Sequence, residues 1–449
     1  MTPSQLPPDG PRPARTIDEA MEQLDTRGVH RRQFVKLLAG TAFAGGAANF
    51  LAACGSSSSA TAGAAAADGK LALLNWTSVG DYSVQWAKAF QEAAKQLGYE
   101  SVVLDGKFDA AVQQNQFNQL LTQKTSAILI GANDPGVIPT LARGANRSKV
   151  LLNAAWGAPA WYTPWDSEGE FYNSFLIPDE LIAVQAVTEA LVKAGGEDAT
   201  YARVGGYATR DATESQRRVG TERGFKQYPK ANYVGELQSK YDPELAQKAA
   251  ASFIAKYPDL RGIVAVNDDV ATGVVAAIKA AGKTPGKDIL VVGANGSTAG
   301  INRVADGTQL ATTGNIPAYP AFVTVAQFHD RLNGWKPEQA ERQFGWHQLV
   351  ITQENVGDFK KRYVDGPIGK SFDIKLLSRT ETKDGWDLQN DAYPIENLQD
   401  LWPEDPQPKD YKLPAQYVAA QKNGDFERIR ALWKAHYKHP VLGPSPAGA

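Results

Sequence analysis

Cysteine and histidine are scarce in this sequence, and their scarcity excludes several kinds of site. The 449 residues include one cysteine, Cys54, and five histidines. A single cysteine cannot form an intrachain disulfide, and so few thiolates and imidazoles argue against a metal site built from them. We therefore expect no disulfide within the chain and no bound metal.

An excess of charge of either sign is also missing. The 47 lysines and arginines nearly balance the 49 aspartates and glutamates, which leaves a formal net charge of -2 at pH 7. This balance does not indicate a nucleic-acid partner, which a basic excess would favour. The composition, 43% hydrophobic and 21% charged, is that of a globular protein long enough for two or more domains.

A long apolar run is absent near the N-terminus, where a membrane span could otherwise lie. Residues 37–53 are apolar, but three glycines and Asn49 interrupt them, and a span needs about 20 mostly apolar residues. The stretch fits a secretory signal better, because charged residues precede it and small residues lead to a cleavage point. The alternative is an Ala/Gly-rich helix with a stray cysteine that occurs by chance.

Two short motifs flank this apolar run. Arg31 and Arg32 open the stretch RRQFVK, which resembles the twin-arginine export signal. The stretch LAAC, which ends at Cys54, resembles the lipobox of bacterial lipoproteins, whose cysteine is lipidated and becomes the new N-terminus. We expect residues 1–53 to be a twin-arginine lipoprotein signal peptide and residues 54–69 to be a flexible tether. The mature protein would then be lipid-anchored in the periplasm or on the outer face of the cell membrane.

From residue 70 onward, short apolar runs alternate with amphipathic helical patterns, which is typical of βα units around a parallel sheet. A first series predicts strands at 71–74, 102–104, 127–130 and 150–152. A second series predicts strands at 201–206, 233–237, 262–266 and 288–292, with helices at 214–228, 243–257 and 270–281. We therefore predict an α/β fold with two similar Rossmann-like lobes in tandem, each with a parallel sheet.

The last hundred residues lack this rhythm. Prolines, aromatic residues and charges mix beyond about residue 346, although residues 426–437 have helical spacing. We expect residues 346–449 to be an irregular C-terminal extension that packs on the lobes.

Three segments of the lobes carry a family resemblance. They are KLALLNWTSVGDYSVQWAKAF from residue 70, GIVAVNDDVATGVVAAIKAAGK from residue 262 and DILVVGANGSTAG from residue 288. They resemble the periplasmic-binding-protein type I superfamily, in particular the ribose/galactose-like sugar-binding components of ABC importers, over about residues 70–336. The resemblance implies a first lobe of residues 70–177 plus 316–345, a second lobe of residues 178–315, and a hinge between them.

This resemblance also implies a small hydrophilic ligand between the lobes, at the C-terminal ends of the strands. A sugar would stack its apolar face on aromatic rings and give its hydroxyl groups to polar side chains, and the hinge would close around it. The candidate ligand-binding residues are Trp76, Asp81, Tyr82, Trp156, Arg217, Arg218, Tyr241, Asn267, Asp268, Asn295 and Asn315.

Several of these residues also have an ordinary structural interpretation. Asn267 and Asp268 could serve simply as the cap of a helix. Either Arg217 or Arg218 could be a solvated helix residue. Trp161 and Trp165, in the loop after Trp156, could fill a core or fix a loop.

The sequence departs from the sugar-binding family at two strand ends. The family usually has an Asp-Arg pair after the fourth strand, where this chain has Asn153-Ala-Ala-Trp156, and its usual aspartate is replaced by Asn295. Because charged groups make stronger hydrogen bonds than neutral ones, we expect a more neutral, aromatic pocket and a ligand with fewer hydroxyl groups than a hexose. A pentose, a polyol, a modified sugar or another small polar compound would fit.

We therefore expect an extracytoplasmic solute-binding lipoprotein of an ABC import system, a monomer whose partners are a small polar ligand and an ABC permease. The sequence has no GxGxxG after the first strand and no GxSxG elbow, so we expect no cofactor and no enzyme. A receptor for a membrane sensor kinase is one alternative, and a secreted hydrolase is another. A transcription repressor of the same fold would need a helix-turn-helix where this chain has an export signal.

Overall fold

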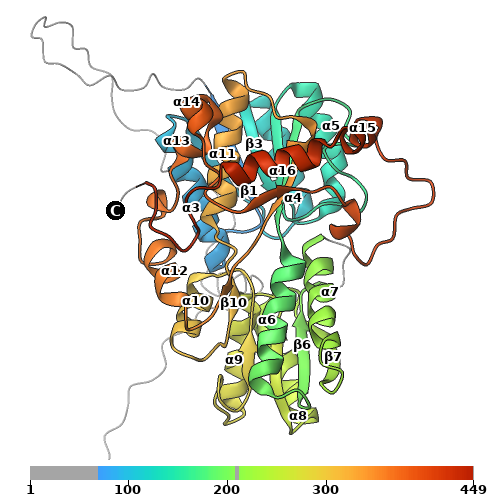
Figure 1. Ribbon diagram of the computed structural model, residues 1–449, viewed down its shortest axis with the longest axis vertical. Coiled ribbons are helices and arrows are strands. Elements are labelled where there is room, and N and C mark those ends of the chain that lie inside the picture. Colours follow the sequence, from blue (N-terminus) through green and yellow to red (C-terminus); the bar gives the residue numbers. More distant parts are fainter. Residues whose placement is uncertain (1–68, 208–211, 448–449) are drawn as a thin grey trace, which may run out of the picture. The chain divides into compact units, whose positions relative to one another are not determined.

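The computed structural model describes residues 69–207 and 212–447 (Figure 1). Three residues of the predicted export signal and lipidation site, Arg31, Arg32 and Cys54, lie outside the described residues. The fold is therefore described from the first predicted strand onward.

The first lobe is built on a seven-stranded sheet in the order β13-β11-β5-β4-β3-β1-β2. Its strands are β1 (Lys70–Asn75), β2 (Glu100–Asp105), β3 (Thr125–Gly131), β4 (Leu151–Ala155), β5 (Tyr172–Pro178), β11 (Gln343–Trp346) and β13 (Ala392–Pro394). All neighbours are parallel except β11 and β13. Strands β4 and β5 are buried along their whole length, as expected for parallel strands with both faces covered.

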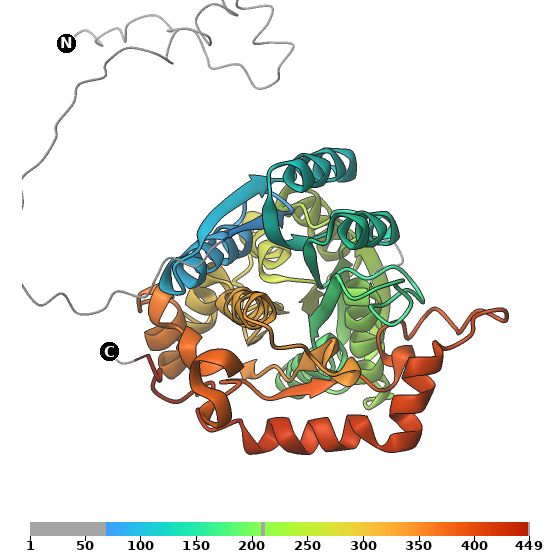
Figure 2. The same ribbon diagram turned by 90° about the horizontal axis from the view of Figure 1, so that it is seen from above.

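Helices connect the strands of this sheet and cover it (Figure 2). They are α3 (Asp81–Gln96), α4 (Ala110–Thr122), α5 (Ile138–Ser148) and α11 (Ala318–Leu332). Helix α3 buries Trp86, Phe90, Ala93 and Ala94, which recur at helical spacing in the sequence. Helix α11 packs beside α3, although the two lie more than 200 residues apart in the chain.

The second lobe has a four-stranded parallel sheet in the order β7-β6-β8-β9. Its strands are β6 (Thr200–Gly205), β7 (Asn232–Gln238), β8 (Leu260–Ala265) and β9 (Leu290–Val292), and its helices are α6 (Glu180–Gly195), α7 (Ala212–Lys226), α8 (Pro243–Lys256), α9 (Asp268–Ala280) and α10 (Thr298–Ala305). The predicted α/β class with parallel sheets is thus confirmed. The sequence pattern did not indicate β5 or α6, which carry the chain from the first sheet to the second.

Three segments of chain cross between the lobes, and one side chain joins them. The first passes from β5 to α6 through Asp179, the second from β10 (Thr312–Thr313) to α11, and the third from β11 to β12 (Val350–Ile351). Strand β12 pairs antiparallel with β10. The Gln348 amide accepts a hydrogen bond from Thr313 Oγ1 at 2.7 Å and donates one to the Asp179 carbonyl at 3.1 Å. These bonds tie the three crossings together at the hinge.

The C-terminal extension is more regular than the sequence predicts. It contributes β13 to the first sheet, beside β11, and it forms α12 (Val356–Tyr363), α13 (Ile374–Leu377), α14 (Arg379–Thr382), α15 (Ala415–Asn423) and α16 (Asp425–Ala435). Only α16 matches a predicted helix, and it lies beside β13 (Figure 1). Short helices and one strand of three residues thus interrupt the irregular chain predicted for residues 346–449, and elements this short leave little readable period.

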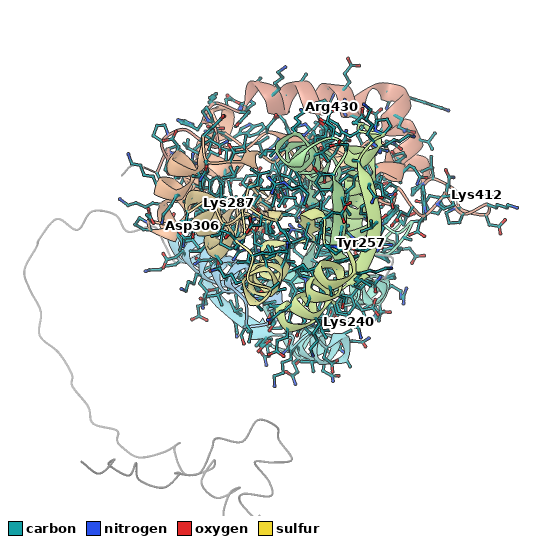
Figure 3. All side chains as sticks on the ribbon, turned by 90° about the horizontal axis from the view of Figure 1, so that it is seen from below. Lys240, Tyr257, Lys287, Asp306, Lys412 and Arg430 are labelled. Atoms are coloured by element: carbon teal, nitrogen blue, oxygen red, sulfur yellow. The ribbon has the colours of Figure 1, made fainter. Side chains whose placement is uncertain are left out.

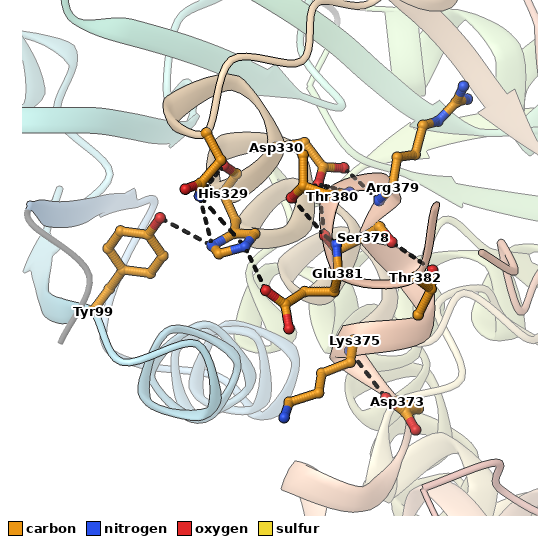
Figure 4. Close-up of polar contacts among 11 residues, drawn as sticks. Tyr99, His329, Asp330, Asp373, Lys375, Ser378, Arg379, Thr380, Glu381 and Thr382 are labelled. Atoms are coloured by element: carbon orange, nitrogen blue, oxygen red, sulfur yellow. Dashed lines mark hydrogen bonds and ion pairs between the residues drawn. The ribbon is translucent and has the colours of Figure 1, made fainter. Parts of the chain in front are cut away.

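One buried carboxylate of the first lobe fixes the start of α14 (Figure 4). Asp330, near the end of α11, is 3% exposed and accepts bonds from the backbone N–H groups of Arg379 and Thr380, each at 3.0 Å. It also accepts from the hydroxyl groups of Ser378 and Thr380 at 2.6 and 2.7 Å. A charged side chain that accepts four such bonds at a helix N-terminus anchors this part of the extension to the lobe.

Tryptophan side chains anchor the extension elsewhere. Trp161 lies 5.3 Å from Trp402 and 5.4 Å from Tyr411 between ring centroids, and Trp165 lies 5.2 Å from Tyr417. Trp161 and Trp165 therefore fix a loop and fill a core, which is the structural alternative for these two residues.

Charged side chains such as Lys287, Lys412 and Arg430 project outward (Figure 3).

Trp402→Ala is expected to destabilise the protein by about 3–5 kcal/mol, because it removes a fully buried ring from the contact with Trp161. Chemical denaturation followed by tryptophan fluorescence and circular dichroism measures this change. Leu332→Ala is the control, because its side chain is 40% exposed. Equal stability of the two variants would show that the extension does not contribute to the core.

Candidate functional site

Four aromatic side chains of the first lobe form one cluster at the carboxyl ends of its strands (the aromatic cluster: Trp76, Tyr82, Trp86 and Trp156). Trp76 follows β1, Trp156 follows β4, and Tyr82 and Trp86 lie in the first turns of α3. The Trp76 ring centroid lies 4.7 Å from those of Trp86 and Trp156 and 6.5 Å from that of Tyr82. The structure thus brings together the three predicted rings and adds Trp86.

Backbone geometry fixes two members of the aromatic cluster. A Cβ atom at Gly131, the last residue of β3, would lie 2.6 Å from the Trp76 ring, so only glycine allows this ring position. Trp156 has a left-handed φ of 63°. Its N–H donates to the Leu176 carbonyl at 3.0 Å, and its carbonyl accepts from Thr213 Oγ1 of the second lobe at 3.5 Å. The strained residue therefore lies where the two lobes meet.

The second lobe contributes a buried arginine to the same region. Arg217, on α7, is 3% exposed. Its Nε and Nη2 atoms donate to the two carboxylate oxygens of Glu180, at 2.9 and 2.6 Å. Nη1 donates to the Val266 carbonyl at 2.8 Å, and Nη2 donates to Asn295 Oδ1 at 2.6 Å. Arg217 therefore links the first hinge crossing to the ends of two strands of the second sheet.

The electrostatics of this pair favour its charged form. Burial opposes the charge of Arg217, but the Glu180 carboxylate outweighs burial, and the pKa of Arg217 rises above its ordinary value. A planar guanidinium that meets a carboxylate through two parallel bonds is the strongest form of such a pair. Arg217 therefore remains charged, with the Glu180 carboxylate directly beside its guanidinium.

Tyr82 and Asn315 face this pair with buried polar atoms. Burial raises the pKa of Tyr82 well above its ordinary value, Glu180 raises it further, and the charge of Arg217 and the Asn315 side chain lower it. The Tyr82 hydroxyl and both polar side-chain atoms of Asn315 are buried, and none makes a hydrogen bond of standard geometry to a described residue. Because buried polar atoms normally have partners, these three atoms are candidates to bind a ligand.

Asn295 stands at the end of β9 in a strained conformation. Its φ is 102°, its N–H donates to Thr313 Oγ1 at 3.2 Å, and its side-chain oxygen accepts from Arg217. The side chain thus reaches the region of Arg217, where a neutral amide replaces the family's aspartate. An aspartate here would add a second negative charge next to Glu180.

Asn267 and Asp268 have structural partners. Asn267 caps α9 by accepting the N–H of Val270 at 2.8 Å. Asp268 is fully buried and accepts bonds from the Ser297 N–H at 2.9 Å and from the side chains of Gln309 and Thr312, each at 2.8 Å. Its carboxylate is thus used within the second lobe, which is the structural alternative that the dipeptide also allows.

Arg218 and Tyr241 belong to a second polar group of the same lobe. Arg218 lies 3.2 Å from Glu214 and 3.7 Å from both Glu236 and Glu404. The Tyr241 hydroxyl lies 3.4 Å from Glu214, and its ring covers Gly206, where a Cβ atom would lie 2.4 Å from it. The side chain of Arg218 thus points toward glutamates and not toward Arg217.

Asp81 lies at the junction of the lobes but binds the protein itself. Its Oδ2 accepts the N–H of Thr298, in the first turn of α10, at 2.5 Å. A carboxylate at a helix N-terminus is favourable, so this bond joins the two lobes. Asp269, on α9, faces the same region, because its Oδ2 would lie 3.8 Å from a Cβ at Gly80.

The sequence pattern indicates neither the site role of Glu180 nor the cluster role of Trp86. Glu180 is the first residue of α6 and is fully buried. An acidic residue in the first turn of a helix normally indicates a favourable dipole contact, so no sequence signal pairs it with Arg217. Trp86 has helical spacing, which by itself indicates only the buried face of α3.

Metal binding and membrane crossing find no support within residues 69–207 and 212–447. In these ranges no three His, Cys, Asp or Glu side chains are grouped as metal ligands. No described helix combines the length and the apolar character that a membrane span requires. The described groups can offer aromatic faces, amide groups and hydroxyl groups, which suit a polar organic ligand.

Known proteins are similar to this chain in sequence and in fold. A sequence profile of the periplasmic binding protein domain matches residues 71–336. The ribose import binding protein RbsB of Salmonella typhimurium is 26% identical over 273 residues, 60% of this chain and 86% of that protein. The D-apiose import binding protein of Paraburkholderia graminis is 25% identical over 265 residues, 59% of this chain and 81% of that protein.

A solved structure has the same fold. It is described as a twin-arginine translocation pathway signal protein from Burkholderia phytofirmans. It matches with a TM-score of 0.62 and 19% identity, over 67% of this chain and 95% of that chain.

Asp269→Asn is expected to change how stability depends on pH. Burial, then the charges of Asp268 and Asp81, raise the pKa of Asp269 from 3.8 to about 6. The folded protein therefore binds this proton more tightly than the unfolded chain does. The resulting stability is complete below about pH 4 and is lost as the pH rises through about 6. Between pH 4 and 7 the wild type should lose about 1–2 kcal/mol relative to the variant, measured by denaturation.

Asp288→Asn is the control, because its pKa shifts in the opposite direction. Asp288 accepts the backbone N–H of Thr284, which lowers the pKa of this exposed carboxyl. Its contribution is present at neutral pH and is lost as the pH falls, so this variant should lose stability relative to the wild type as the pH rises. Parallel pH curves for the wild type and Asp269→Asn would contradict the raised pKa.

Proposed function

The chain belongs to the periplasmic binding protein family, and we propose that it is the extracytoplasmic solute-binding lipoprotein of an ABC import system. It binds a small carbohydrate-like ligand between its two lobes. The observation that carries this proposal is the group of buried polar atoms of Tyr82 and Asn315 beside the aromatic cluster and Arg217, which make no hydrogen bond of standard geometry among the described residues. A sugar offers what this arrangement lacks, because it has hydroxyl groups for the polar atoms and a C–H face for the rings.

The order of lobes and hinge gives the binding mechanism. The aromatic cluster belongs to the first lobe, Arg217 belongs to the second, and Asn315 lies on a crossing between them. A ligand that touches all three binds the closed form better than the open form and therefore shifts the population toward closure. The permease would then recognise the closed form.

The names of the relatives support a carbohydrate ligand, and a pentose in particular. The two relatives described above are named for the import of ribose and of D-apiose, and both sugars are pentoses. The end of the fourth strand lacks the Asp-Arg pair that is usual in the sugar-binding family, and it carries Asn153 in a neutral sequence. Asn153 is buried and bonded to Gln327 and Asn173 at 2.8 and 2.9 Å. A site with neutral amides in place of carboxylates favours a ligand with fewer hydroxyl groups.

We also infer export by the twin-arginine route and lipid anchoring at Cys54. The support is the order of the motifs RRQFVK, apolar run and LAAC before the first strand. The description of the Burkholderia phytofirmans protein as a twin-arginine translocation pathway signal protein agrees with this inference. An acyl anchor would keep the binding lobes close to a permease.

A panel of pentoses, hexoses and polyols is expected to include at least one compound that stabilises the protein. A single-site ligand at 100 times its Kd raises the unfolding free energy by about 2.7 kcal/mol, which thermal denaturation detects. Asn315→Ala should weaken that ligand by about 10- to 100-fold in calorimetry, because it removes up to two buried hydrogen bonds. Asn302→Ala is the control, because Asn302 is exposed on α10.

Three outcomes would contradict parts of this proposal. Unchanged affinity of Asn315→Ala would mean that the ligand binds elsewhere. A panel without any binder, together with turnover of a glycoside or an ester, would favour the secreted hydrolase. Binding of a ligand that no permease encoded beside this gene takes up would favour a receptor for a membrane sensor kinase.

Cys54→Ser is expected to abolish lipid labelling in a bacterial host and to release the protein from the membrane fraction. Arg31→Lys with Arg32→Lys should keep the precursor inside the cell, because the paired arginines are the export signal. Labelled palmitate and cell fractionation measure both effects. Labelling that persists in the Cys54→Ser variant would contradict the proposed anchor.

A further inference from the structure

Glu180 occupies the side of Arg217 that would otherwise bind an anion. The Nε and Nη2 atoms of an arginine form the fork that matches a carboxylate, and Glu180 fills this fork with bonds of 2.9 and 2.6 Å. Arg217 also donates to the Val266 carbonyl and to Asn295. Four of its five N–H groups are thus used within the protein, so at most one can reach a ligand.

The burial of this pair makes its charge balance matter for the ligand. Glu180 is fully buried and Arg217 is 3% exposed, so water screens their charges weakly. An anionic ligand near Arg217 would meet the negative charge of Glu180 and find the fork occupied. A neutral hydroxyl group would meet neither obstacle, and it could accept the remaining N–H.

We propose that Glu180 is the residue that makes the site select uncharged sugars and reject their carboxylated counterparts, by filling the carboxylate-binding fork of Arg217. This inference rests on the proposed function and adds the charge class of the ligand. Glu180 acts through Arg217 and is therefore a positioning residue. Glu180 is the first residue of α6 and follows the first hinge crossing directly, so its bonds to Arg217 hold the guanidinium close to the hinge.

Paired sugars that differ in one carboxylate test the inference. The probes are D-galactose with D-galacturonate, D-glucose with D-glucuronate, and D-ribose with D-riburonate, each measured by calorimetry. The wild type should bind the neutral member of a pair at least tenfold more tightly. Glu180→Gln keeps the size of the side chain but removes its charge, and it should reduce that neutral-to-anionic ratio at least tenfold.

Two further variants separate charge from packing. Glu180→Asp keeps the charge but shortens the side chain, so it should weaken the neutral sugar while the ratio stays within threefold of the wild type. Glu236→Gln is the matched control, because Glu236 contacts Arg203 and Arg218 and not Arg217. Its ratio should also stay within threefold. A purely structural role of Glu180 would lower both affinities together and leave the ratio unchanged.

The outcomes distinguish this inference from the proposed function. If the wild type binds no sugar at all, the proposed function fails and the inference fails with it. If the wild type binds a neutral sugar but prefers the anion, or if Glu180→Gln leaves the ratio within threefold, only the inference is overturned.

A variant that does not fold is informative as well. Should Glu180→Gln fail to fold, Glu180→Gln with Arg217→Gln restores a buried pair without net charge. A double variant that folds and still rejects the anion supports charge neutralisation. A double variant that folds and binds the anion as tightly as the neutral sugar overturns the inference, because masking of the Arg217 charge would then not be what excludes the anion.

Discussion

The buried ion pair of Arg217 and Glu180 is the constraint on which the rest of the site depends. Removing two charges from water is costly, and only close geometry with additional hydrogen bonds compensates for it. Here the two carboxylate contacts, the Val266 carbonyl and Asn295 supply that geometry. Asn295 has a φ of 102°, so the backbone at the end of β9 adopts a strained conformation that brings its side chain to the arginine. The pair thus determines which neighbouring groups remain for a ligand.

Those remaining groups lie on the other side of the junction and are held by different means. The rings of the aromatic cluster are fixed by packing, by the absence of a side chain at Gly131 and by the left-handed backbone of Trp156. Asn315 lies on the second hinge crossing. Thr313, two residues earlier, fixes this crossing, because its hydroxyl group accepts from the Asn295 N–H and donates to Gln348. A rigid surface of rings and a hinge amide therefore face an arginine whose charge is already neutralised. This combination favours a neutral ligand with both apolar and hydroxyl-bearing faces.

The sequence could predict the two lobes because periodicity is local, and it could predict the strand ends because parallel strands expose them at one edge. Tyr82, Trp156, Arg217, Asn295 and Asn315 lie near one another for this reason. The pairing of Arg217 with Glu180 was not predictable, because the two residues are 37 positions apart and each has an ordinary local role on its own helix. Asp268 and Arg218 show that a suitable residue type does not by itself predict a ligand contact. Their residue types suit a ligand, but tertiary contacts with Gln309, Thr312 and several glutamates occupy their polar atoms. Strand β13 of the extension was not predictable, because it has three residues and completes a sheet whose other members are distant in the chain.

Several polar contacts also join the lobes outside the hinge. Asp81 accepts one N–H from Thr298, Thr213 reaches the Trp156 carbonyl at 3.5 Å, and the extension adds Glu404, whose N–H lies 3.4 Å from Ser215 Oγ. The Arg218–Glu404 pair is partly exposed and spans 3.7 Å, so solvent weakens it. Each of these bonds contributes little, and Asp81 is opposed by the nearby charge of Asp269. Such polar contacts favour the closed form only weakly, and under the proposed function a ligand that touches both lobes would add to its stability.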